Sequence, residues 1–228
     1  MFEPSELFDL SQTGHAALFD GCRYAWEPLA RLAAYLVPRA RPQLRNRCDG
    51  TAYIGEHVSI GEGTMLEDGV MILGPAVIGR NCQIRHNAYI RQHVIIGDDC
   101  VVGNATEIKN SILFNKAQAP HFNYVGDSIL GFKAHLGAGV KISNFKLFPG
   151  NITVPIDGRP FDTGLRKFGA LLGDFCEVGC NAVLSPGSIL GRESVVYPNV
   201  VWRGVLPEGM IVKNKSAQEI TRRRARTA

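Results

Sequence analysis

The chain has 228 residues, of which 45% are hydrophobic and 20% charged, a composition typical of soluble globular proteins. No apolar run reaches membrane-spanning length, and the N-terminal stretch MFEPSELFDL is too acidic for a signal peptide, so we expect a cytoplasmic protein without a membrane anchor. The four arginines at 222, 223, 224 and 226 equal the whole formal excess of +4. The rest of the chain therefore lacks the basic stripe that nucleic-acid binding requires.

Residues 1–49 are predicted to be a helical N-terminal extension followed by a basic linker. In the stretch 22–36, apolar side chains recur near helical spacing, and Pro38 ends the run. We expect this helix to pack on the first turn of the next domain and to shield its open end, as the terminal caps of repeat proteins do. Docking of a partner on its Trp and Tyr is the alternative.

Residues 50–213 are dominated by a period of six. Ten consecutive positions at this spacing carry a large aliphatic residue: Ile54, Ile60, Leu66, Ile72, Ile78, Ile84, Ile90, Ile96, Val102 and Ile108. A small residue stands two positions before each, as in Ala52, Val58 and Thr64. A hexapeptide period is the signature of a parallel β-helix, in which three repeats make one triangular coil. Residues eighteen apart should then stack at a strand spacing of about 4.8 Å.

The period fails twice. The step from Ile108 to Leu130 is 22 residues, which is not a multiple of six, so we expect a loop near 113–126 to bulge out of the coil. A second loop is expected near 145–169, which is rich in Pro and Gly, before the period returns at Leu172. Loops that interrupt a rigid repeat usually carry the function. The tail, 214–228, opens with a capping box and is expected to form a short basic helix.

Six cysteines raise the question of metal or disulfide sites. Cys82, Cys100 and Cys176 each occupy the small-residue position of a hexapeptide, where packing explains them. Cys176 and Cys180 lack the two-residue spacing of zinc knuckles. We therefore expect structural cysteines in a reducing compartment and no metal site.

Arg91 and Lys109 are the first candidate site residues. Each directly follows an inward aliphatic residue, and they are eighteen apart, so their cationic ends should lie side by side. Like charges on neighbouring strands repel, which favours an anion between them, and a phosphate suits the pair. Two extended side chains that diverge into water are the alternative. In the first predicted loop, His121 is a candidate general base, because histidine is the residue type that changes charge near neutral pH, and Tyr124 is close by in sequence.

The run from 102 to 145, VGNATEIKNSILFNKAQAPHFNYVGDSILGFKAHLGAGVKISNF, resembles a known family. It is similar to the acetyltransferase domain of the bifunctional UDP-N-acetylglucosamine pyrophosphorylase/glucosamine-1-phosphate N-acetyltransferase. The shared pattern is VGN-x-x-E-x-K, then H-x-x-Y-x-GD, then LGAG and a closing Asn-aromatic pair. The resemblance implies an all-β fold, a left-handed parallel β-helix. The handedness rests on the resemblance, since the sequence alone does not show it. It also implies a homotrimer.

The resemblance assigns roles to particular residues. It implies that His121 is the general base that deprotonates the amine of the sugar as this attacks acetyl-CoA, the co-substrate. The implied substrate-binding residues are Arg91, Lys109, Tyr124, Asn144, Lys167 and His135, and the implied coenzyme contacts are Ala138, Cys180 and Pro198. The expected activity is N-acetylation of an amino-sugar phosphate, such as glucosamine-1-phosphate, or of a related sugar nucleotide.

The chain departs from this family at several points. No nucleotidyltransferase domain precedes the solenoid, so uridylyl transfer is not predicted. His135 stands where the family has an asparagine, Cys180 where it has a serine, and Pro198 where a small residue is expected. These departures leave a second hypothesis open, that of a non-catalytic sensor or scaffold for a sugar phosphate or sugar nucleotide.

A third hypothesis is a γ-class carbonic anhydrase, which has a similar helix with zinc at subunit interfaces. His86, His121 and His135 are the candidate ligands. The spacing of His121 and His135 does not follow the close pairing of that family, so this hypothesis is the weakest of the three.

Overall fold

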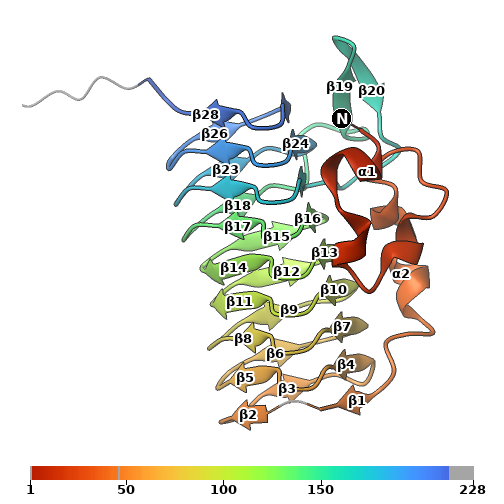
Figure 1. Ribbon diagram of the computed structural model, residues 1–228, viewed down its shortest axis with the longest axis vertical. Helices are drawn as coiled ribbons and strands as arrows, with labels where there is room; N and C mark the ends of the chain where they lie inside the picture. Colours follow the sequence, from red (N-terminus) through yellow and green to blue (C-terminus); the bar gives the residue numbers. More distant parts are fainter. Residues whose placement is uncertain (1, 46, 216–228) are drawn as a thin grey trace, which may run out of the picture.

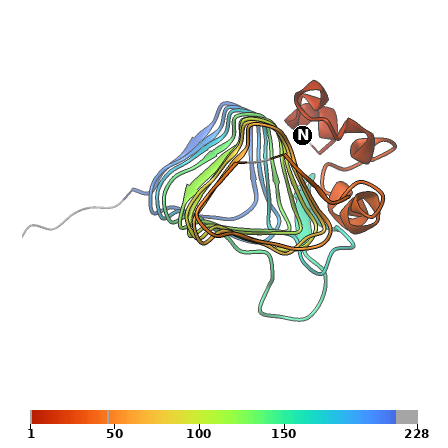
Figure 2. The same cartoon turned by 90° about the horizontal axis from the view of Figure 1, so that it is seen from below.

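The computed structural model describes residues 2–45 and 47–215, and its main body is a triangular parallel β-helix (Figures 1 and 2). Three parallel sheets, named A, B and C here, form its walls. Sheet A contains, among the described residues, β1 (Gln43–Leu44), β4 (Val58–Ile60), β7 (Ala76–Ile78), β10 (Val94–Ile96), β13 (Ser111–Leu113), β16 (Ile129–Leu130), β21 (Ala170–Leu172), β24 (Ser188–Leu190) and β27 (Val205–Leu206).

Sheets B and C complete the triangle. Sheet B consists of β2 (Arg47–Asp49), β5 (Met65–Glu67), β8 (Gln83–Ile84), β11 (Val101–Asn104), β14 (Gln118–His121), β17 (His135–Leu136), β22 (Glu177–Val178), β25 (Val195–Val196) and β28 (Ile211–Val212). Sheet C consists of β3 (Tyr53–Ile54), β6 (Met71–Ile72), β9 (Tyr89–Ile90), β12 (Glu107–Lys109), β15 (Tyr124–Gly126), β18 (Lys141–Ile142), β23 (Val183–Leu184) and β26 (Val201–Trp202).

The hexapeptide period produces the predicted stacking of residues eighteen apart and the predicted inward core. Ala76 pairs with Val94 and Ile78 with Ile96, so residues eighteen apart stack on adjacent strands. The large aliphatic residues from Ile60 to Ile108 point inward and are almost fully buried in one continuous core. The corners between walls repeatedly place Asn, Asp or another residue at positive φ, as at Asn81 and Asp99, which lets each short strand turn into the next wall.

The first predicted loop, 113–126, does not exist. These residues form β13, β14 and β15 within the three walls, and Val94 pairs with Ser111, seventeen residues later. The step of 22 residues consists of two shortened corners, from Ile108 to Leu113 and from Val125 to Leu130, each of five residues instead of six. Asn110 (φ 44°) and Asp127 (φ 50°) make these tighter turns. The shortened turns keep both strands in register, so nothing bulges outward.

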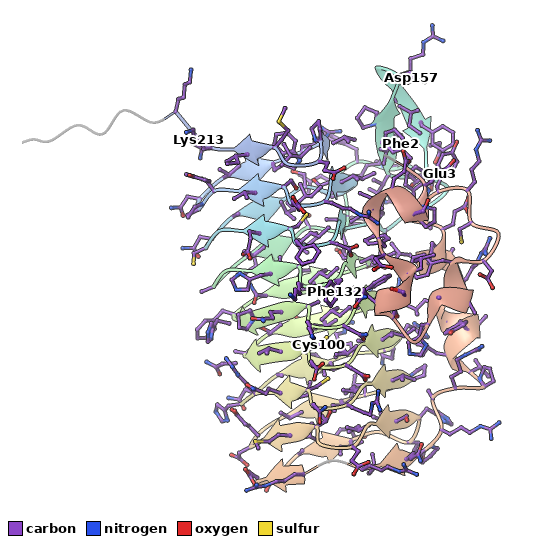
Figure 3. All side chains as sticks on the ribbon, in the orientation of Figure 1. Phe2, Glu3, Cys100, Phe132, Asp157 and Lys213 are labelled. Carbon is purple, nitrogen blue, oxygen red and sulfur yellow. The ribbon has the colours of Figure 1, made fainter. Side chains whose placement is uncertain are left out.

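The second break does leave the coil. Leu130 pairs with Leu172, 42 residues later, so one turn carries a long insertion between β18 and β21. Within it, β19 (Thr153–Ile156) and β20 (Arg159–Asp162) form an antiparallel hairpin. Figure 3 shows Asp157, at the tip, projecting beyond the last turns. Both breaks occur where sheet C passes into sheet A, which we call the C–A corner.

The N-terminal extension covers a side wall, which corrects the expectation that it caps the first turn. Its elements are α1 (Pro4–Leu7), the 3₁₀ turns η1 (Leu10–Gln12) and η2 (Ala16–Phe19), and α2 (Pro28–Leu36). Buried Phe8, Trp26 and Leu32 pack against outward apolar residues of sheet A, including Ile112 and Leu171. Figure 2 shows the extension outside one wall of the triangle. A solenoid wall with apolar residues on both faces needs such a cover.

The buried cysteines are thiols in the core. Cys82 and Cys100 lie fully buried in the small-residue position and donate to backbone carbonyls of Gly97 and Phe114. Burial raises the pKa of Cys176 to about 11, so that thiol is protonated and unreactive at neutral pH. Among residues 2–45 and 47–215, no cluster of three or more His, Cys, Asp or Glu side chains could hold a metal ion. No described helix is long and apolar enough to cross a membrane. The predicted C-terminal helix at 216–228 lies outside the described residues.

Candidate functional site

A pocket of about 230 Å³ opens at the C–A corner, and it unites five of the predicted substrate residues. It is lined by Arg91, Lys109, Tyr124, Asn144, Phe145 and Lys167. Arg91 follows β9, Lys109 ends β12 and Tyr124 begins β15, so three successive turns of sheet C contribute. Asn144 and Lys167 come from the two ends of the insertion. The insertion therefore completes the pocket where it leaves and re-enters the coil at this corner.

Arg91 and Lys109 are stacked as the spacing predicted, since Ile90 pairs with Ile108 directly before them. Their charges, however, are neutralised within the chain. Arg91 Nη1 lies 2.9 Å from Glu107 Oε1, and Lys109 Nζ lies 3.1 Å from Asp127 Oδ2. The hydrogen bond to Glu107 raises the pKa of Arg91. Repulsion between the two cations is thus relieved by carboxylates, and a bound anion is not required for this purpose.

Asp127 is the central residue of this site, and sequence reasoning gave it no role. Its side chain is 6% exposed, and it accepts hydrogen bonds from Lys109 Nζ, from Asn110 Nδ2 at 2.8 Å and from Asn144 Nδ2. Its backbone N–H donates to the Lys109 carbonyl. The sequence did contain one signal for Asp127, the five-residue step that ends at Leu130. A corner shortened in this way brings Asp127 directly onto the turn below.

Asn144 and Tyr124 meet over a glycine. Asn144 Nδ2 donates a hydrogen bond of 3.3 Å to the Tyr124 hydroxyl oxygen. A Cβ at Gly126 would lie 2.6 Å from Asn144 Nδ2 and 2.8 Å from that hydroxyl, so only glycine leaves room for both. Burial, followed by the charge of Glu107, raises the pKa of Tyr124, so its hydroxyl stays a donor at neutral pH. This arrangement leaves amide, hydroxyl and cationic donors facing one pocket.

The predicted base stands on the neighbouring corner, between sheets B and C. His121 ends β14, is exposed and pairs with Asn104 of the turn below. Its carbonyl accepts from Gly139 N–H, the Ala138 carbonyl from Asn181 N–H, and the Cys180 carbonyl from Asn199 N–H. Successive turns of this B–C corner therefore stack His121, Ala138, Cys180 and Pro198. The predicted base and the predicted coenzyme residues share one edge of the helix, and His121 does not line the C–A pocket.

His135 is separated from the other substrate residues. It lies on the outer face of sheet B, where its Nδ1 is 2.8 Å from Glu177 Oε2. The shallow hollow around it is lined by Asp99, Lys116, Gln118 and Lys133. Within one chain, the structure does not bring His135 to the C–A pocket, because the alternation of a short strand directs it out of a different wall.

Comparison with known proteins agrees with this architecture. The family described as the GMPPB C-terminal domain matches residues 72–157. A GlmU bifunctional protein from Methanococcus maripaludis is 32% identical over 121 residues, which cover 53% of this chain and 29% of that protein. The family match includes Arg91, Lys109, Tyr124 and Asn144 of the C–A pocket but not Lys167. Over this region the chain is similar to hexapeptide-repeat acyltransferases.

Other relatives extend the same likeness. A bifunctional sugar-1-phosphate nucleotidylyltransferase/acetyltransferase from Sulfurisphaera tokodaii is 32% identical over 97 residues, which cover 42% of this chain and 24% of that protein. A putative uncharacterized acetyltransferase, YaiX, of Escherichia coli is 34% identical over 105 residues, or 46% of each chain. The chain spans less than half the length of each of these relatives. Their complete activities are therefore not carried over to this hexapeptide-repeat protein.

Proposed function

We propose that the protein transfers an acetyl group from acetyl-CoA to the amine of an amino-sugar phosphate or a related sugar nucleotide. The observation that carries this proposal is the C–A pocket, where Arg91, Lys109 and Lys167 converge with the neutral donors of Tyr124 and Asn144. With Glu107 and Asp127 counted, these charged groups sum to +1, which suits one phosphate held by several donors.

In this mechanism His121 acts as the general base. The amine of the sugar is largely protonated at neutral pH, and it becomes a nucleophile when His121 takes a proton as nitrogen attacks the thioester carbon. The coenzyme would lie along the B–C corner over Ala138, Cys180 and Pro198, and donors near the carbonyl would stabilise the tetrahedral oxyanion. The thiolate of coenzyme A leaves, and no covalent enzyme intermediate is needed.

Because His121 and the C–A pocket lie on different edges of sheet C, we propose that a complete site forms between copies in a homotrimer. In such an assembly one chain would provide the phosphate pocket and another the base. We also propose that the protein works in the cytoplasm, where acetyl-CoA is available. Two relatives carry acetyltransferase in their names, which supports the reaction class.

The test is release of free thiol from acetyl-CoA with glucosamine-1-phosphate as acceptor, comparing the natural protein with His121→Ala and Arg91→Ala. We expect His121→Ala to reduce kcat by about 10²–10⁴-fold. Arg91→Ala should mainly raise the KM for the sugar. Unchanged turnover in His121→Ala would exclude its role as the base, and the oligomeric state of each variant controls for assembly.

A binding protein without turnover is the second candidate. The proline at position 198 favours it, because Pro198 stands on the B–C corner and has no backbone N–H to offer a coenzyme. This alternative expects the sugar phosphate to bind through Arg91 while no thiol is released with any amine acceptor.

A further inference from the structure

A groove beside the β19–β20 hairpin is not used by the proposed reaction. Two adjoining hollows, of about 360 and 240 Å³, share Thr153, Pro186 and Arg203 and therefore form one continuous groove. It lies between the hairpin and the last turns of the C–A corner. We call this the hairpin groove. Its size is in the range of small-molecule sites and exceeds what a single phosphate fills.

The charge of the hairpin groove is positive. Arg203 and Lys146 line it, and none of its lining residues is acidic. Among the described residues, the Arg203 guanidinium has no hydrogen-bond or ion-pair partner, whereas Lys146 Nζ donates to the Asn151 carbonyl. This contrasts with Arg91 and Lys109, which carboxylates neutralise. The groove therefore offers an anionic ligand two cations that no carboxylate neutralises.

The rest of the groove lining consists of flat apolar side chains and of backbone that no side chain covers. Pro155, Pro160 and Pro186 face the groove together with Phe148, whose side chain is 77% exposed. Glycines at 158, 187 and 204 add no side chain, and the hydroxyl groups of Thr153 and Ser185 supply polar contacts. Flat apolar surfaces beside a planar guanidinium suit a ring attached to phosphate groups.

The groove and the C–A pocket lie along the same corner. Arg203 occupies the position directly after Trp202 that Lys109 occupies after Ile108, and the pairing of sheet C places it four turns above Lys109. At about 4.8 Å per turn, the two cations are separated by about 19 Å along the helix. Lys146 and Phe145 are adjacent in sequence, and each lines one of the two cavities. One phosphate cannot contact both cations at this spacing, so the hairpin groove holds its anion separately from the C–A pocket.

We propose that the hairpin groove binds the nucleoside diphosphate portion of a ligand, with Arg203 and Lys146 holding the diphosphate. This deepens the proposed function, on which it rests for the placement of the amino sugar at the C–A pocket. The nucleoside diphosphate has two possible sources, a nucleotide-linked amino sugar as acceptor or the nucleotide half of coenzyme A. Diphosphate recognition is common to both.

The test is isothermal titration calorimetry of the full chain with UDP and, separately, with coenzyme A. The variants are Arg203→Ala and Lys146→Met, and the matched control is Arg159→Ala, an exposed arginine on the hairpin outside the groove. We expect Arg203→Ala to weaken binding at least about tenfold, because a charge-assisted hydrogen bond is lost, and Arg159→Ala to leave it unchanged.

The two titrations distinguish the sources. Arg203-dependent binding of UDP alone assigns the groove to a nucleotide-linked sugar, binding of coenzyme A alone assigns it to the coenzyme, and binding of both assigns it to diphosphate recognition. Binding of neither, or equal binding by the natural protein and Arg203→Ala, overturns the proposal. Failure of acetyl transfer alone would not, because Arg203-dependent binding is measured without an acceptor. Loss of binding in Arg91→Ala but not in Arg203→Ala would place the nucleotide in the C–A pocket and also overturn it.

Discussion

The two interruptions of the hexapeptide period occur at the same corner but have opposite structures. The first removes one residue from each of two successive turns, and the chain stays within the walls. The second adds a long insertion to one turn and builds a hairpin outside them. The shortened corners bring Asp127 onto Lys109, which lines the C–A pocket. The insertion adds further lining residues to that pocket and forms one side of the hairpin groove. A site on a repeat scaffold can thus be made by deletion and by insertion together.

The largest expected effect is a loss of stability at the junction where the insertion rejoins the coil, compared with its exposed hairpin tip. A Cβ at Gly169 would lie 2.2 Å from the Gly126 carbonyl oxygen and 2.3 Å from Ser128 Oγ, where the insertion rejoins the shortened corner. We expect Gly169→Ala to lower the free energy of unfolding by about 3 kcal/mol, measured by urea denaturation.

The matched control is Gly158→Ala at the hairpin tip. Gly158 has φ +74° but nothing within 4 Å of an added Cβ, so only backbone strain of about 1–2 kcal/mol is expected, confined to the hairpin. Equal losses in the two variants would mean that the junction is no more constrained than the tip.

The next effect concerns the shortened corner itself. Asp127→Ala leaves Lys109, which is 20% exposed, without its carboxylate and removes the acceptor of Asn110 and Asn144. We expect a loss of about 2 kcal/mol in unfolding free energy and weaker sugar-phosphate binding. Asp127→Asn keeps the shape and an acceptor but not the charge, so it should retain more stability. Full affinity in Asp127→Ala would show that the pocket does not depend on this carboxylate.

Removal of the hairpin should affect the N-terminal extension and spare the coil. Phe161 of β20 packs on Tyr24 at 4.9 Å between ring centroids, and Val154 is fully buried against the same cluster. Thr153 pairs with Asp162, so Asn-Gly can replace residues 154–161 as a tight turn. We expect faster proteolysis within residues 2–40 and an unchanged far-ultraviolet circular dichroism spectrum for the coil. Cooperative loss of the whole fold would contradict the separation of the two interruptions.

The smallest expected effect is a pH dependence of stability that the first interruption has and the second lacks. Burial, and then the charge of Lys109, lowers the pKa of His93, which lies on the turn directly below the shortened corner. Because the neutral form is favoured on folding, this stability is present above about pH 6.5 and is lost as pH falls through the lower folded pKa. His93→Gln should reduce the fall in Tm between pH 7 and pH 5. The insertion near 145–169 contains no histidine and should not contribute.

The period predicted the core and the stacking of residues, but it misread the first interruption. A gap of 22 residues is compatible with a loop and equally with two five-residue steps, because spacing counts residues without saying which of them pair. The hydrogen-bond register decides, since Ile112 pairs with Ile129 seventeen residues on. Ser111 and Ser128 recur at the shortened corners, and each hydroxyl bonds a carbonyl of its own turn, which is the local signal that the pattern contained.

The candidate site was predictable in part for the same reason. Arg91 and Lys109 could be placed together because a rigid repeat converts sequence spacing directly into distance. Their partners Glu107 and Asp127 could not, since side-chain pairing depends on rotamers and on the geometry of the corner. The N-terminal extension was misplaced because its amphipathic helix specifies an apolar face without specifying which apolar surface it covers.

By itself, the sequence determined that this chain is a β-helix with an inward aliphatic core and where its period breaks. These features follow from local periodicity, which acts on every turn alike. Only the tertiary structure decided which interruption of the period stays within the walls and which wall the N-terminal extension covers. It also decided which carboxylates pair with the cations of the C–A pocket. Those features arise from contacts between residues far apart in the chain, where register and packing select among arrangements that the pattern alone leaves equal.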